Sequence, residues 1–178
     1  MRVLIGADLD TEIFNRNCSW AKPLTAAQLA ENCRRNDAQI RHVAATAAAY
    51  ADVVLGVSAG NEVTVDWTEH LVATERVAGF LRCLKQNQPR PVTLCDNNVP
   101  WQGKIKDLVP LVDFISIHSY PAWLNVPVRE ALAWTEREYN EIAGLYPDKP
   151  VIITEAGWTT TSSGRGIRRE DATTANQA

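Results

Sequence analysis

The sequence predicts an α/β fold that is built on a parallel β-sheet. Five short apolar runs alternate with longer segments whose apolar residues recur at helical spacing. The runs are continuously apolar, as in parallel strands that are buried on both faces. A chain of 178 residues, 46% of them hydrophobic and 22% charged, is long enough to bury one core. We therefore expect a single domain over residues 1–178.

The predicted strands are short apolar runs that end in polar or turn-forming residues. In chain order, they are expected at residues 3–5, 53–57, 91–95, 112–117 and 151–154. Val and Ile are frequent in these runs, and β-branched side chains favour strands. Each pair of runs is separated by enough chain for the crossover that parallel neighbours require.

Helical periodicity and start signals place helices between these strands. They are expected over residues 25–51, 66–88, 102–108 and 127–145, and a further helix should start at about residue 169. Thr25 and Gln28 match a capping box at the start of the first helix. The second helix should begin near Asp66, with Glu69 three residues further on.

Polar side chains follow every predicted strand. They are Asp8 and Asp10, Asn61 and Glu62, Asp96 and Asn97, His118 and Tyr120, and Glu155 and Trp158. An open sheet concentrates its site at one switch point, so contributions from successive strands fit the mouth of a barrel better. The glycine-rich phosphate loops of nucleotide-binding folds are absent from the sequence. A complete (β/α)8 barrel takes about 250 residues, so a chain of 178 residues would form only part of one.

Two glutamates follow strands that should be buried, and each needs an explanation. Glu62 comes after VVLGVSAGN and Glu155 comes after VIIT. An ionisable group there is costly unless it is paired or functional. A helix cap or a structural ion pair is the alternative for each glutamate. Two carboxylates among aromatic residues, with six tryptophans in the chain, match the chemistry of glycoside hydrolysis.

The segments VLGVSAGNEV, DFISIHSYP and VIITEAGWTTTSSG resemble glycoside hydrolase family 17, the β-1,3-glucanase family of clan A. The resemblance implies an incomplete catalytic domain, a partial (β/α)8 TIM barrel with about strands 3 to 7 and without strands 1, 2 and 8. It implies that Glu62 is the acid/base and that Glu155 is the nucleophile of a retaining hydrolase acting on β-glucan. A glucan transglycosylase with the same site, an inactive carbohydrate-binding fragment and an unrelated α/β domain are the alternatives.

The resemblance also implies a set of substrate-binding residues around the two glutamates. They are Asn61, Asp96, Asn97, His118, Tyr120, Trp123 and Trp158. For several of them a structural role is an open alternative: a turn cap for Asn61, a helix cap for Asp96, a buried structural histidine for His118 and loop packing for Trp123. Asp8 and Asp10 are expected to be solvated loop groups.

Composition narrows the classes of partner. The net charge of −3 and the lack of a basic block argue against nucleic acid. No apolar run approaches the roughly 18 residues of a membrane span, and the first residues do not resemble a signal peptide. Four cysteines and three histidines lack metal-ligand spacing, so we expect neither a metal nor a cofactor. An oligosaccharide or β-glucan is the expected partner, while the compartment and the oligomeric state stay open.

Overall fold

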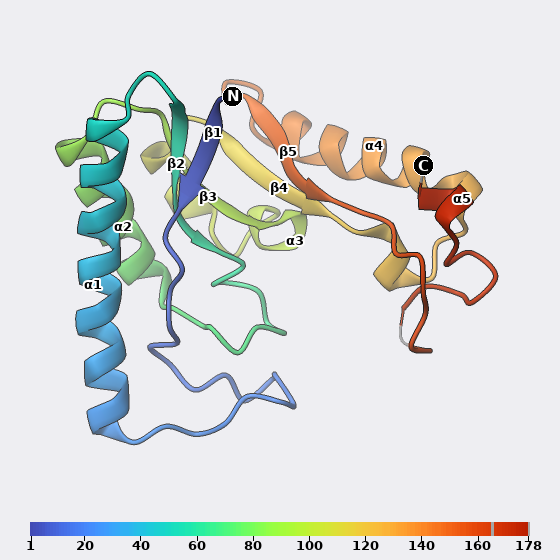
Figure 1. The fold of residues 1–178 in the computed structure, drawn as a ribbon, viewed down its shortest axis with the longest axis horizontal. Coiled ribbons are helices and arrows are strands. Elements are labelled where there is room, and N and C mark those ends of the chain that lie inside the picture. The colour runs from blue at the N-terminus through green and yellow to red at the C-terminus, as the bar shows by residue number, and fades with distance from the viewer. Residues whose placement is uncertain (165, 178) are drawn as a thin grey trace.

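The computed structural model describes residues 1–164 and 166–177 and contains a five-stranded parallel sheet. The strands are β1 (Val3–Gly6), β2 (Val54–Asn61), β3 (Val92–Asn97), β4 (Ile115–Ser119) and β5 (Val151–Ala156). Their order in the sheet is their order in the chain (Figure 1). Doubly wound sheets reverse direction at a switch point, whereas a (β/α)8 barrel adds each strand on the same side. The fold is therefore part of a (β/α)8 barrel, which confirms the predicted fold class.

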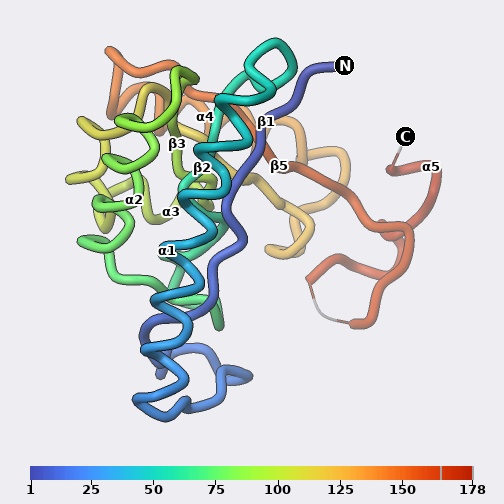
Figure 2. The backbone as a smooth tube through the Cα atoms, turned by 60° about the vertical axis from the view of Figure 1, so that its left-hand side comes forward, coloured from blue at the N-terminus to red at the C-terminus, as the bar shows by residue number. Residues whose placement is uncertain are grey.

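Three long helices cover the outer face of this sheet. They are α1 (Ala26–Ala49), α2 (Thr74–Asn87) and α4 (Val128–Leu145). α1 and α2 contact each other beside β1, β2 and β3, and α4 contacts β4 and β5 (Figure 2). The predicted capping box is present, because Thr25 and Gln28 bond each other's backbone N–H groups. Short segments complete the fold: α3 (Asn98–Trp101), the 3-10 helices η1 (Lys106–Leu111) and η2 (Pro121–Leu124), and α5 (Thr174–Gln177).

The second predicted helix starts later than expected. The pair Asp66 and Glu69 suggested a start near residue 66, but α2 begins at Thr74. The amide of Asn15 donates hydrogen bonds to the backbone carbonyls of Asp66 and Thr68, and this tertiary contact holds the segment in a loop. The predicted helix over residues 102–108 is likewise replaced by α3 and η1. The last predicted helix, expected from about residue 169, is only the short α5.

The core lies between the sheet and the helices. Its largest fully buried side chains include Trp101, Leu81, Leu84, Ile115 and Ile117. The central strands are mostly buried as their apolar sequences predicted, apart from Leu55 of β2, but the outer strands are less so. Leu4 of β1 is 38% exposed and Ile152 of β5 is 46% exposed, because each of these strands has a neighbour on one side only. None of the helices in the described part of the chain is long and apolar enough to cross a membrane.

Candidate active site

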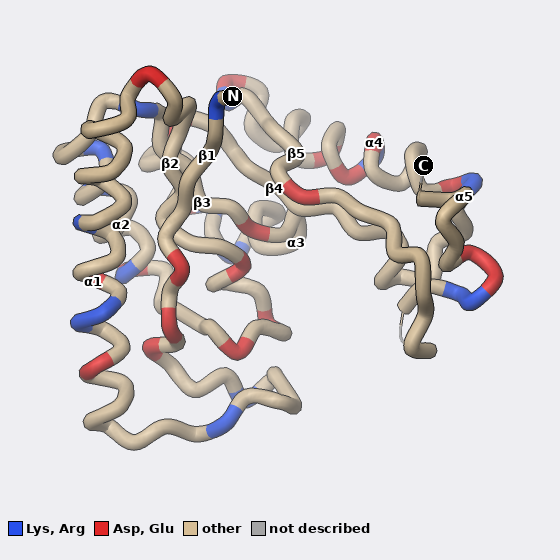
Figure 3. Tube along the Cα trace, in the orientation of Figure 1, with Lys and Arg blue, Asp and Glu red and all other residues tan. Residues whose placement is uncertain are grey.

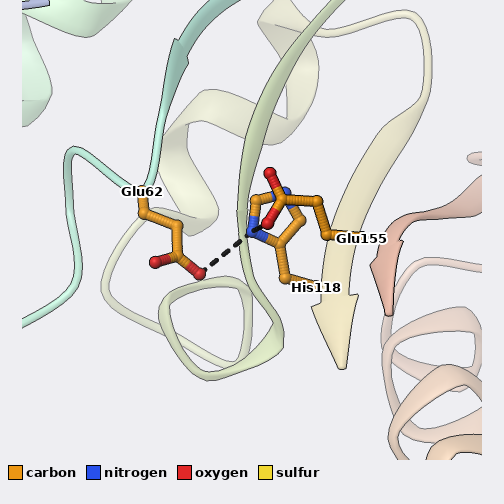
Figure 4. Close-up of side chains that lie close together, drawn as sticks. All are labelled: Glu62, His118 and Glu155. Carbon is orange, nitrogen blue, oxygen red and sulfur yellow. Dashed lines mark hydrogen bonds and ion pairs between the residues drawn. The ribbon is translucent and has the colours of Figure 1, made fainter. Parts of the chain in front are cut away.

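The carboxyl ends of β2, β4 and β5 bring together Glu62, His118 and Glu155 (Figure 4). His118 Nδ1 lies 3.0 Å from Glu62 Oε1 and 3.5 Å from Glu155 Oε2. One ligand atom from each of the three side chains lies within 4.8 Å of the other two. The two carboxylates therefore converge, although 92 residues separate them in the sequence.

The end of β2 turns Glu62 toward this cluster. The pairing of β2 with β3 is irregular between Ser58 and Asn61, and such a bulge redirects the side chains that follow it. Ser58 Oγ accepts a hydrogen bond from the N–H of Cys95 at 2.8 Å and donates one to the carbonyl of Gly60 at 2.6 Å. Glu62 has φ 48°, and its N–H donates to the Cys95 carbonyl at 2.9 Å. The carboxylate thus projects from a left-handed residue just beyond the strand.

His118 is fully buried and faces both carboxylates. Burial lowers the pKa of His118, but the nearby Cys95 sulfur, the Glu62 hydrogen bond and the charges of Glu155 and Glu62 outweigh burial and raise the pKa to about 9. At neutral pH, His118 is therefore a cation that bridges two acidic groups. His118 Nε2 has no hydrogen-bond partner among the described residues.

Tyr120 contacts the same Glu155 oxygen that faces His118. Its hydroxyl donates a hydrogen bond to Glu155 Oε2 at 3.1 Å. Burial, together with the charge of Glu155, raises the pKa of Tyr120 to about 12, so the phenol keeps its proton at neutral pH. This hydrogen bond restrains the carboxylate of Glu155.

An aromatic pocket of about 470 Å³ adjoins Tyr120. Trp123, which is 66% exposed, and the half-buried Trp158 line it together with Gly157. The indole N–H of Trp158 donates to the backbone carbonyl of Asp171 at 2.8 Å, which fixes the orientation of this ring. A second pocket of about 490 Å³ lies along the concave side of the sheet and includes Asn61, His118 and Glu155.

Two residues expected at the cleft make contacts within the fold. Asp96 is 0% exposed, and its carboxylate accepts hydrogen bonds from Thr64 and from the backbone N–H of Asn97, so its expected role in binding substrate stays a prediction. Its neighbour Asn97 uses its side-chain oxygen to accept the Val99 N–H at 3.1 Å, at the start of α3. Asp8, expected to be a solvated loop residue, is exposed but also lines the second pocket. Asp10 pairs with Arg35 at 3.2 Å.

The sequence analysis did not single out Ser58, Thr64 or Cys95. Ser58 and Cys95 line the second pocket, and Thr64 contacts Asp96. Cys95 lies directly before the strand-end pair Asp96 and Asn97, and this position near the carboxyl end of β3 was a usable signal. The contacts of Ser58 and Thr64 depend on the irregular end of β2 and have no counterpart in the sequence pattern.

The cluster of Glu62, His118 and Glu155 is also the one group of three His, Cys or acidic side chains in the described ranges that is close enough to share a cation. His118 Nδ1 already lies between the two carboxylates. Figure 3 shows acidic residues along the segments that leave the carboxyl ends of β1 and β2, whereas Lys and Arg are spread over α1. This acidic end of the sheet is unfavourable for anionic ligands and compatible with a neutral sugar.

Solved structures with the same architecture are glycoside hydrolases. An endo-laminarinase from Formosa Hel1_33_131 has a TM-score of 0.72 at 20% identity, and the match covers 93% of this chain and 51% of the other. A family 17 β-1,3-glucanosyltransferase from Rhizomucor miehei has a TM-score of 0.69 at 19% identity, with 99% and 57% covered. The chain thus spans about half the length of these relatives.

A mannanase of another glycoside hydrolase family has a similar fold. A family 113 β-mannanase from Alicyclobacillus acidocaldarius has a TM-score of 0.54 at 19% identity, and the match covers 80% of this chain and 40% of the other. No curated protein matches the sequence. The sequence model of the BtgE/BtgC glycoside hydrolase domain matches residues 23–178. Because this match includes most of the chain and both converging glutamates, the chain belongs to the BtgE/BtgC glycoside hydrolase domain family.

Proposed function

We propose that this domain cleaves β-1,3-glucosidic bonds of β-glucan with retention of configuration, as part of carbohydrate metabolism. The observation that carries the proposal is the separation of the two carboxylates, whose nearest oxygens lie within 4.8 Å. Retaining glycosidases hold their two carboxyl groups about 5–5.5 Å apart, whereas inverting enzymes need about 6.5–9.5 Å to admit a water molecule. A nearest-oxygen distance of at most 4.8 Å fits the retaining geometry and supports direct attack by a carboxylate.

Glu155 is the nucleophile and Glu62 is the acid/base in this proposal. Glu155 attacks the anomeric carbon while the bond to the leaving oxygen breaks, and Glu62 gives its proton to that oxygen. A covalent glycosyl-enzyme results. Glu62 then removes a proton from water, the water oxygen attacks the anomeric carbon, and Glu155 leaves. Tyr120 supports the assignment of Glu155, because its hydroxyl donates to the carboxylate that has to approach the sugar.

The aromatic pocket supplies the sugar-binding surface. Sugars present apolar C–H faces, and the exposed ring of Trp123 together with Trp158 gives them flat apolar partners beside the nucleophile. Asn61 lines the second pocket next to Glu62 and is the proposed partner of the sugar 2-hydroxyl. The choice of β-1,3-glucan is supported by the laminarinase and by the glucanosyltransferase, one structure of which holds laminaritriose.

Incubation of the chain with laminari-oligosaccharides tests the proposal. We expect shorter products whose reducing ends keep the β configuration when they are followed by NMR from the start of the reaction. Glu155→Ala should lose all turnover, and Glu62→Ala should lose most of it. Glu141→Ala is the matched control, because Glu141 is an exposed residue of α4 and its loss should leave the rate unchanged.

The same experiment separates the alternatives. Longer products formed from short oligosaccharides would identify a transglycosylase, in which a sugar hydroxyl replaces water in the second step. Saturable binding of laminari-oligosaccharides without any product would identify a carbohydrate-binding fragment. A wild-type rate for Glu155→Ala, or products with inverted configuration, would refute the proposed mechanism.

A further inference from the structure

Asp96 is a buried carboxylate that the proposed reaction does not use. It lies in β3, the strand next to Glu62, and is 0% exposed. Burial raises the pKa of Asp96 to about 6, although hydrogen bonds from Thr64 and Asn97 act in the opposite direction. A carboxylate costs several kcal/mol to bury without compensation, so its partners indicate what it does.

All the partners of Asp96 are hydrogen-bond donors. Oδ2 accepts from the backbone N–H of Thr64 at 3.1 Å and from the Thr64 hydroxyl at 2.7 Å. Oδ1 accepts from the backbone N–H of Asn97 at 2.8 Å. Two backbone N–H donors and a hydroxyl around the two oxygens favour an ionised carboxylate. Each oxygen accepts a backbone N–H, that of Thr64 or that of Asn97. In Asp96→Asn, the amide NH2 group would therefore face one of these two N–H donors.

These contacts hold the chain immediately after Glu62. Thr64 is two residues beyond Glu62, and the N–H of Glu62 itself donates to Cys95, the residue before Asp96. Two consecutive residues of β3 therefore hold Glu62 from both sides. Such restraint is needed because a left-handed backbone costs roughly 1–2 kcal/mol for a residue with a side chain, and Glu62 has φ 48°.

We propose that Asp96 is a positioning residue for Glu62: its carboxylate fixes Thr64 and thereby holds the Glu62 carboxylate against His118 Nδ1. The contact that reports this arrangement is the 3.0 Å hydrogen bond between His118 Nδ1 and Glu62 Oε1. The position of the Glu62 carboxylate does not depend on the proposed function. The effect of Asp96 on turnover rests on the proposed role of Glu62 as the acid/base.

NMR of the histidine side chains tests the positioning without any need for activity. The chain has three histidines, and the exposed His42 and His70 serve as internal references. In protein labelled with ¹⁵N histidine, Asp96→Asn should move the Nδ1–H resonance of His118 upfield, because its bond to Glu62 lengthens. The resonances of His42 and His70 should not move.

Two variants of Thr64 separate positioning from general destabilisation. Thr64→Val removes the hydroxyl bond to Asp96 but keeps the backbone bond, so it should move the His118 resonance in the same direction by a smaller amount. Thr64→Ser keeps the hydroxyl and should restore the wild-type resonance. Thr64→Val also tests the proposal if Asp96→Asn fails to fold.

Asp113→Asn is the matched control. Asp113 also accepts a backbone N–H of β3, that of Val92 at 2.8 Å, and it pairs with Lys85. Val92 is the first residue of β3, so this carboxylate acts at the opposite end of the strand. The substitution should reduce stability and leave the His118 resonance unchanged.

Turnover provides the second measurement. On laminari-oligosaccharides, Asp96→Asn should lower kcat by about 10-fold to 100-fold through displacement of Glu62, with KM changed less than about twofold. A folded Asp96→Asn or Thr64→Val protein with an unchanged His118 resonance would overturn the positioning role. If the resonance moves as expected but the wild-type chain does not cleave glucan, the positioning role stands and the proposed function fails.

Discussion

His118 should make the free energy of unfolding of the domain depend on pH. The domain should be more stable at acidic and neutral pH than at alkaline pH. Its pKa is raised to about 9 in the folded protein, against about 6.5 for an unperturbed histidine. A raised pKa means that the folded state holds the proton more tightly than the unfolded state. The resulting stabilisation is fully present below about pH 6.5 and is lost as the pH rises through about 9.

The size of this effect follows from the two pKa values. A folded-state pKa of about 9 and an unfolded value of about 6.5 correspond to a contribution of about 3 kcal/mol. His118 is 0% exposed, but the side chains of its partners Glu62 and Glu155 are 30% and 39% exposed, so solvent screening makes this value an upper one. This contribution is absent from His118→Asn. The difference in the free energy of unfolding between the wild-type chain and His118→Asn should therefore be up to about 3 kcal/mol larger at pH 6 than at pH 10.

Urea unfolding of both proteins at a series of pH values measures this difference. The comparison cancels the titration of the distant lysines and tyrosines, which both proteins share. His42→Asn is the control, because His42 is exposed on α1 and its loss should leave the pH dependence unchanged. A difference between wild type and His118→Asn that stays constant from pH 6 to pH 10 would show that His118 is not charged in the folded protein.

Four further substitutions test ion pairs, core packing and helix capping in the fold. Arg76→Met should cost about 2–3 kcal/mol, because it leaves the carboxylate of Glu12, whose side chain is 4% exposed, without its ion-pair partner. Arg34→Met removes an exposed pair and should cost less than about 1 kcal/mol. Trp101→Ala should cost about 3–5 kcal/mol, because the indole is fully buried. Thr25→Ala should cost about 1 kcal/mol through the lost cap of α1. Urea unfolding curves measure each value, and equal losses for Arg76→Met and Arg34→Met would contradict the assigned burial of Glu12.

The convergence of the site could be predicted because it depends on topology. Glu62, His118 and Glu155 each follow or end an apolar run, and parallel strands place such residues at one edge of the sheet. The alternation of strands and helices was enough to bring these residues together, whatever the details of the loops. Tyr120 comes directly after β4, and the same topology brings its hydroxyl to Glu155.

The orientation of individual side chains could not be predicted in the same way. Asp96 and Asn97 are adjacent strand-end residues, but one is buried against Thr64 and the other caps α3. The irregular pairing of β2 with β3 between Ser58 and Asn61 is a feature that no sequence pattern predicted. The start of α2 was missed for a related reason, since Asn15 holds residues 66–68 from a distant part of the chain.

The left-handed backbone of Glu62 means that the residue that would be most stable at this position differs from the residue that the proposed reaction needs. Glycine is the residue that best tolerates this conformation, so a search for stabilising substitutions would select Glu62→Gly. Compared with Glu62→Ala, that change should be more stable by about 1 kcal/mol, yet both lack the carboxylate. Engineers who wish to stabilise this domain should therefore leave residue 62 unchanged and strengthen its surroundings instead.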